Sequence, residues 1–400
     1  MLPYLGSGPS PSGKRCDQYD PVVNDLVDFL EANQPCALDK AVQEAYHKIP
    51  WFMDKFNIRD SHAFLVFASS LLRWTPTENR EAKDIVDILC MFYFVLDQPP
   101  LLGLQSPMTP KQAGQPLTWL SAWMVNYSRH IGLFMDSPES ITTESLEGFK
   151  RSPKYNWEEA EIPEDGFKTF NEFFYRRLKP GARPIASPDD DRVIVYPADC
   201  TYDNSIPNQS IVDISGDGVI YVKNLPWTIG TLLQESQYAA SFHGGVWMHA
   251  FLNVFNYHRV HAPVSGKVLE VKNIHGTVYL EVGTNFDPVS STHAPDIPNR
   301  PGYQFLQARG MVILENAVVG KVAVLPIGMA HVSSVSLTIN EGQVLDKGEE
   351  IGYFQFGGSD VVCVFQSRAG LKPKDFVPSN STYSKMGTIL ARAEGLSGEL

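Results

Sequence analysis

The chain has 400 residues, of which 43% are hydrophobic and 20% charged, a composition typical of an ordinary globular protein with two or three domains. Its formal net charge of −12 excludes a protein that holds nucleic acid through a broad basic surface. The five cysteines form no Cys-x-x-Cys pair, so we predict neither a zinc site nor a disulfide framework, and a reduced, cytoplasmic location.

The N-terminal residues 1–18 are rich in Pro, Gly and Ser, which predicts a disordered lead-in. They contain no basic region followed by a long apolar run, so we expect no signal peptide. The longest apolar stretch, residues 88–96, is much shorter than the roughly 20 residues that a membrane-spanning helix needs. We therefore expect no integral membrane segment.

Residues 19–148 are expected to form a helical domain. Val22, Leu26 and Phe29 recur at spacings of three and four residues, and residues 117–135 read as a buried amphipathic helix. The histidines of this part are lone residues on helical stretches, for which we predict structural roles. A polar segment, residues 149–166, is expected to be a linker between this domain and the C-terminal part.

From residue 167 to residue 400 the pattern is that of a mainly antiparallel β domain. Short β-rich runs at 193–196, 267–271 and 321–325 alternate with turn residues. The segment 341–354 resembles the flattened barrel of biotinyl and lipoyl carrier domains, but Lys347 lacks the flanking methionines usual at their modified lysine. We therefore predict an α+β fold, with a helical N-terminal domain followed by a β domain that includes a flattened barrel-sandwich element.

The most distinctive short motif is Phe356-Gly357-Gly358-Ser359-Asp360, close to the C-terminus. One interpretation is a hydrolase nucleophile, but the elbow that presents such a serine has glycine two residues after it, where this chain has Val361. A second interpretation is an ordinary turn, because Gly-Gly-Ser is common turn chemistry. Taken alone, the triplet favours the turn.

Three further motifs precede this one in chain order. They are Phe173–Pro184, Tyr196-Pro197-Ala198-Asp199 and Tyr257–Gly266, the last of which includes His258 and His261. In this order and spacing the four motifs resemble the phosphatidylserine decarboxylase family of pyruvoyl-dependent enzymes. The resemblance covers residues 167–393, somewhat more than half of the chain.

The resemblance implies a proenzyme that cuts its own backbone. The Ser359 hydroxyl attacks the carbonyl of Gly358, which needs a general base, and His261 is the matching residue. An imidazole in that role needs its other nitrogen held by an acceptor, which we expect Asp199 to supply. Glycine at position 358 leaves the attacked carbonyl unobstructed.

The expected products are a β chain of residues 1–358 and an α chain of residues 359–400, which stay associated. Ser359 becomes a covalent pyruvoyl cofactor, whose carbonyl accepts the electron pair released with CO₂. His258 matches the residue that protonates the substrate after this step. Arg259 is expected in a structural salt bridge, while Arg176 and Arg183 are expected to brace the domain. No metal site is predicted, because the two histidines lack a third ligand at a recognisable spacing.

The substrate is less clearly indicated. The chain departs from the usual family pattern at Cys200, at Asn256 and in its Gly-Gly-Ser-Asp cleavage motif. With its helical N-terminal part, it resembles the soluble fungal branch that includes tryptophan decarboxylase. We therefore expect a free, aromatic L-amino acid as the small-molecule substrate, with L-tryptophan first. Phosphatidylserine is the alternative substrate, and an inactive binding protein that keeps the fold is the alternative from another class. Whether the enzyme forms a homodimer stays open.

Overall fold

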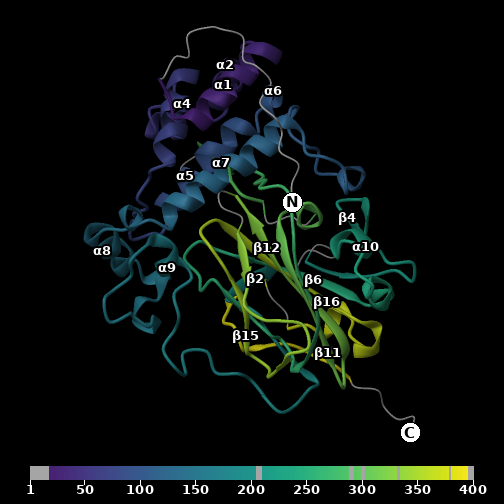
Figure 1. Cartoon of the computed structure of the whole chain (residues 1–400). Coiled ribbons are helices and arrows are strands. Elements are labelled where there is room, and N and C mark those ends of the chain that lie inside the picture. The colour runs from purple at the N-terminus through teal and green to yellow at the C-terminus, as the bar shows by residue number, and fades with distance from the viewer. Residues whose placement is uncertain are drawn as a thin grey trace.

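The computed structural model describes residues 18–203, 210–287, 292–298, 302–330, 334–377 and 380–394. Most of the expected lead-in, residues 1–17, lies outside the described residues. Helices dominate the N-terminal part and antiparallel strands the C-terminal part, and in Figure 1 the early helices lie at one end of the sheets. The predicted α+β class is confirmed.

The helices expected around Val22 and over residues 117–135 are present and begin at recognisable caps. Asp20 caps the first helix by accepting from the backbone N–H of Val22, and Thr118 caps the helix expected over residues 117–135 by accepting from Ser121. The helices are α1 (Pro21–Asn33), α2 (Ala37–Lys48), α3 (Pro50–Lys55), α4 (Ser61–Leu71), α5 (Asp84–Leu96), α6 (Pro99–Leu102), α7 (Trp119–Met135), α8 (Thr143–Arg151), α9 (Phe170–Phe174) and α10 (Ile229–Leu232).

The strands form one large sheet and several small ones, and their pairing is antiparallel throughout. The large sheet contains β2 (Cys200–Asp203), β3 (Ile211–Asp213), β6 (Val246–Leu252), β8 (Gly266–Ile274), β11 (Arg309–Asn316), β12 (Gly320–Met329), β14 (Val344–Leu345), β16 (Gly358–Phe365) and β17 (Asn380–Ser384). A three-stranded sheet contains β7 (Arg259–His261), β13 (Val335–Leu337) and β15 (Glu350–Phe354). The remaining pairs are β1 (Val193–Val195) with β18 (Ile389–Arg392), β4 (Val219–Val222) with β5 (Leu225–Thr228), and β9 (Gly283–Asp287) with β10 (Thr292–Asp296).

These sheets are open. Among the described strands, the order of the large sheet runs from β14 at one end to β17 at the other without closing. The segment expected to resemble a carrier-type barrel divides between two sheets, since β14 pairs with β8 and β15 pairs with β7.

Strand β16 is buried along its whole length, and its two faces contribute to different hydrophobic clusters. Val361 and Cys363 pack into the larger cluster, which also contains residues of the helical part, while Val362 and Val364 pack into the smaller one. Since successive side chains of a strand point to opposite faces, consecutive residues of this strand meet different surroundings.

The helical part is joined to the β part by polar contacts as well as by apolar packing. The hydroxyl of Tyr93 on α5 donates to the carbonyl of Val278 at 2.8 Å, and the carboxylate of Asp97 accepts from the backbone of Val282 at 2.9 Å. In the described ranges, no helix is both long enough and apolar enough to cross a membrane. The expected cytoplasmic location stays a prediction.

Candidate active site

Ser359 lies at the start of β16, between two neighbouring strands. It faces Gly328 on β12 and Leu252 on β6, and it is fully buried. Its hydroxyl oxygen has no hydrogen-bond partner among the described residues. A buried hydroxyl without a partner is costly, so Ser359 is a candidate for a chemical role.

The two glycines before this serine meet different constraints. Gly357 has φ of 151°, a conformation that side-chain-bearing residues rarely adopt. At Gly358 a Cβ atom would lie 2.7 Å from Cγ of Met329 and 3.2 Å from the carbonyl oxygen of Met329. Glycine at 358 therefore allows the close approach of β12, and leaves its own carbonyl free of a side chain.

His261 on β7 is nearly buried and is held at both ring nitrogens. Its Nδ1 lies 2.8 Å from the carbonyl oxygen of Gly348, and its Nε2 lies 3.0 Å from the hydroxyl of Tyr257. Since a carbonyl can only accept, Nδ1 carries the proton, and Nε2 accepts from Tyr257. Burial is the largest cause that lowers the pKa of His261, although the Gly348 carbonyl acts in the opposite direction. The imidazole is therefore neutral near pH 7 and has a nitrogen able to accept a proton.

The expected hydrogen bond between Asp199 and His261 is not formed, so that expectation is wrong for this structure. The Gly348 carbonyl occupies the ring nitrogen that Asp199 was expected to hold. The Asp199 carboxylate instead accepts two bonds from Arg183, at 2.8 and 2.5 Å, one from the Tyr383 hydroxyl at 2.5 Å and one from the backbone of Met386 at 2.9 Å.

Asp199 acts on the histidine at longer range. Its charge raises the pKa of His261 slightly against the dominant effect of burial. The guanidinium of Arg183 lies 5.9 Å from the centre of the Tyr257 ring, and Tyr257 bonds His261. The motif residues therefore form one connected cluster, in which Tyr257 is the link that the sequence analysis missed.

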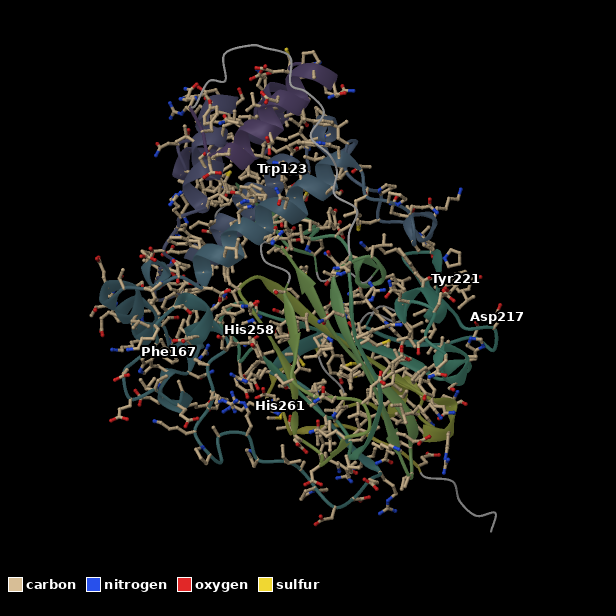
Figure 2. The ribbon with its side chains drawn as sticks, in the orientation of Figure 1. Trp123, Phe167, Asp217, Tyr221, His258 and His261 are labelled. Atoms are coloured by element: carbon tan, nitrogen blue, oxygen red, sulfur yellow. The ribbon has the colours of Figure 1, made fainter. Side chains whose placement is uncertain are left out.

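His258 belongs to the same motif as His261, but its ring lies in an apolar environment. Its ring stacks on Phe174 of α9 at 3.9 Å and meets Phe354 edge-on at 6.3 Å. Neither of its nitrogens has a hydrogen-bond partner among the described residues. Burial, followed by the nearby charge of Arg176, lowers the pKa of His258 well below its usual value. Figure 2 shows both His258 and His261 near the edge of the β region that faces the segment with Phe167.

The structure does not join these histidines to the serine. The Ser359 hydroxyl bonds neither His258 nor His261 in the uncleaved chain. The catalytic roles expected for Asp199, His258, His261 and Ser359 therefore stay predictions. The arginines behave as expected of bracing residues: Arg259 pairs with Glu350 at 2.7 Å, and Arg176 donates to the Tyr155 carbonyl at 2.9 Å.

A second polar cluster, not predicted from the sequence, lies directly beside the serine. Asp360 is fully buried and accepts from the Tyr303 hydroxyl and the Gln304 amide, both at 2.8 Å. The buried ring of His249 lies 3.7 Å from the same carboxylate. Burial raises the pKa of Asp360 and lowers that of His249. A charged residue inside the apolar run 358–365 was the available signal for this cluster.

A cavity of about 380 Å³ reaches the glycine before the serine. Its walls come from α3 and α5 on one side, and from the end of β6 and the β10 region on the other. Gly358 is among the lining residues. Its volume lies in the range of about 300–1,000 Å³ that is common for small-molecule sites.

Comparisons with known proteins agree with the motifs. A sequence model of the family described as phosphatidylserine decarboxylase matches residues 170–392. Phosphatidylserine decarboxylase proenzyme 3 of Schizosaccharomyces pombe is 32% identical over 263 residues, which cover 66% of this chain and 25% of that protein. Phosphatidylserine decarboxylase proenzyme 2 of Oryza sativa subsp. japonica is 35% identical over 247 residues, 61% of this chain and 36% of that protein.

A third relative has a more similar length. Decarboxylase iboD of Amanita muscaria is 29% identical over 269 residues, 63% of this chain and 75% of that protein. The chain thus spans less than half the length of the first two relatives and about three quarters of the third.

Proposed function

Because this chain belongs to the phosphatidylserine decarboxylase family, we propose that it is a carboxy-lyase that matures by cutting its own backbone between Gly358 and Ser359. The observation that carries the proposal is the family match over residues 170–392, which includes the Gly-Gly-Ser sequence. The buried hydroxyl of Ser359, which has no partner within the described part of the chain and lies beside a sterically required glycine, supports it independently.

The residues present fit the pyruvoyl group on which enzymes of this family depend. Buried Ser359 would be its source, and a cavity reaches the preceding residue. Once formed, such a group supplies a carbonyl that accepts the electron pair left when CO₂ departs. The buried strands on either side shield that position from water except through the cavity.

The other residues of the cluster prepare proton transfers. Neutral His261, with its Nδ1 proton held by the Gly348 carbonyl, offers Nε2 as the general base for the Ser359 hydroxyl. The Tyr257 hydroxyl donates to that nitrogen in the uncleaved chain, so it must either pass its proton to Nε2 while it accepts the proton of Ser359, or leave Nε2 before the attack. His258 is proposed to protonate the substrate carbon, since its unpartnered nitrogens leave it free to exchange a proton.

For the substrate, phosphatidylserine is better supported than the L-tryptophan expected first from the sequence. The relatives that match this chain are mostly named phosphatidylserine decarboxylase proenzymes. A free amino acid is the second candidate. It is favoured by the similarity to decarboxylase iboD and by a cavity whose volume suits a small molecule.

Replacement of the serine tests the proposal. Wild-type protein should separate on a denaturing gel into a large chain and the short chain 359–400, and should release CO₂ from short-chain phosphatidylserine faster than from L-tryptophan. Ser359→Ala should remain a single chain of 44.6 kDa and release none. Ser367→Ala, an exposed position in the same short chain, is the matched control and should behave as wild type.

Turnover by Ser359→Ala would overturn the proposed cofactor. A wild-type protein that stays uncleaved and inactive on every substrate would instead favour the inactive binding protein. Faster turnover of L-tryptophan would reverse the order of the two substrates.

A further inference from the structure

The cavity at Gly358 is built in large part by the helical N-terminal segment, for which the sequence analysis predicted no chemistry. Trp51 of α3 and the residues Lys83 and Asp87 at the start of α5 line one side. Asp296 of β10 and Phe251 of β6 line the other side. The bond proposed to be cut therefore faces a chamber that the β domain alone does not complete.

Trp51 links the two walls of this cavity through a hydrogen bond. Its indole N–H donates to the backbone carbonyl of His293 on β10 at 2.7 Å, which ties α3 to the β9–β10 hairpin. The ring is 45% exposed, so it stands at the solvent side of the cavity. The hydrogen bond holds the helical wall and the hairpin wall at a fixed separation.

The walls carry one cation and one anion that lack ion-pair partners. Among the described residues, exposed Lys83 makes no ion pair, and half-buried Asp296 makes none either. Asp87 differs from them, because its carboxylate is already paired with Lys55 at 2.5 Å. A ligand that brings both an anionic and an ammonium group would satisfy the two unpaired charges together.

We propose that Lys83 and Asp296 form a recognition site for a serine phosphodiester headgroup, in which Lys83 receives the phosphate and Asp296 attracts the ammonium group. This deepens the proposed function and rests on it, because the headgroup must reach the backbone at Gly358. The helical segment then selects the substrate, while the β domain carries the reacting groups. Lys83 is an exposed residue of the lining, so a phosphate bound to it would leave the remainder of a lipid or a glycerol on the side of the solvent.

The uncleaved Ser359→Ala protein allows binding to be measured without turnover, since the cavity is present in the uncleaved chain. The probes are glycerophosphoserine and glycerophosphate, titrated by calorimetry at low salt. We expect Lys83→Gln to weaken both probes about fivefold, the effect of losing one exposed ion pair. Asp296→Asn should weaken glycerophosphoserine by a similar factor and leave glycerophosphate unchanged, because only the former has an ammonium group.

Lys40→Gln is the matched control, because Lys40 is also exposed and lies on α2 away from the cavity. Equal affinities for Lys83→Gln and Lys40→Gln would overturn the inference, as would the absence of binding to the Ser359→Ala protein. A second experiment compares binding to vesicles with and without phosphatidylserine. Binding that requires both phosphatidylserine and Lys83 would show that the recognised headgroup is that of a lipid. If binding depends on Lys83 while cleaved wild-type protein decarboxylates nothing, the proposed function fails and the recognition site stands.

Discussion

Replacing Asp199 by asparagine should cost much of the stability of the β part. The carboxylate and its partner Arg183 are almost completely buried, with 1% and 5% of their side chains exposed, and two short bonds join them. Tyr383 and Met386 donate to the same carboxylate from the segment that follows the proposed cleavage site. An asparagine side chain at this position would keep one acceptor oxygen and place an amide N–H₂ against the buried guanidinium.

The loss of unfolding free energy depends on how well the charge of Arg183 is compensated once the Asp199 carboxylate is gone. Breaking a buried ion pair by removing one partner costs about 3–5 kcal/mol. Glu159 still pairs with Arg183 at 2.7 Å, so we expect the lower end of that range, about 3 kcal/mol. Since Asp199 does not bond His261, the substitution should disturb stability more than it disturbs the protonation of that histidine.

Urea unfolding of uncleaved Ser359→Ala protein, with and without Asp199→Asn, measures this difference. Asp190→Asn is the control: that aspartate is 35% exposed and pairs with Arg192 at the surface, so its loss should stay within about 0.5 kcal/mol. Equal unfolding midpoints for the two aspartate variants, with unchanged slopes, would refute the argument that Asp199 is a buried clamp.

Two further predictions concern buried titratable groups. Burial lowers the pKa of His258 and His261 in the folded state, so the unfolded chain binds more protons than the folded chain as the pH falls. The contribution of these histidines to stability should therefore be full above about pH 6.5, the pKa of an unperturbed histidine, and should fall as the pH is lowered through and below that value. His258→Phe, which loses no hydrogen bond, should reduce that fall in urea titrations between pH 7.5 and 5.5, and an unchanged fall would contradict it. Asp360→Ala should destabilise by about 2 kcal/mol or more because two buried donors lose their acceptor, whereas Asp360→Asn keeps an acceptor oxygen and should cost less; equal losses would show that charge dominates.

The sequence was sufficient for several of the helices and strands. Apolar periodicity identified the helices α1 and α7, and β-rich runs identified β8 and β12. These patterns are local, and each reports how one segment buries its own apolar face. The four motifs indicated which residues to expect at the site, but they did not predict that Ser359 and His261 lie on strands.

The partners of the site residues could not be predicted in the same way. The acceptor for His261 is the backbone carbonyl of Gly348, which any residue type could supply, so no side-chain pattern marks it. Tyr257 stood inside a motif already identified, but its contact depends on how the chain turns before β7. Asp199 was expected, by chemical analogy, to accept a hydrogen bond from His261. In the structure its carboxylate instead pairs with the buried guanidinium of Arg183.

The pairing of the C-terminal strands determines whether the two chains would stay together after the proposed self-cleavage. The short chain 359–400 contains β16 apart from its first residue, Gly358, together with β17 and β18, and each of them pairs with strands that belong to the long chain. β16 is hydrogen-bonded on both edges, to β12 from Ser359 to Phe365 and to β6 over the same residues.

Cutting the bond before Ser359 leaves both ladders in place from Ser359 onward, because only the first pair of β16, Gly358 with Met329, stays on the long chain. We therefore expect the short chain to stay with the long chain in gel filtration under native conditions and to separate only in denaturant. The buried apolar side chains of β16 further stabilise the association, since release of the strand would expose side chains that pack into both hydrophobic clusters. Native release of the short chain after cleavage would mean that the strand order changes when the bond is cut.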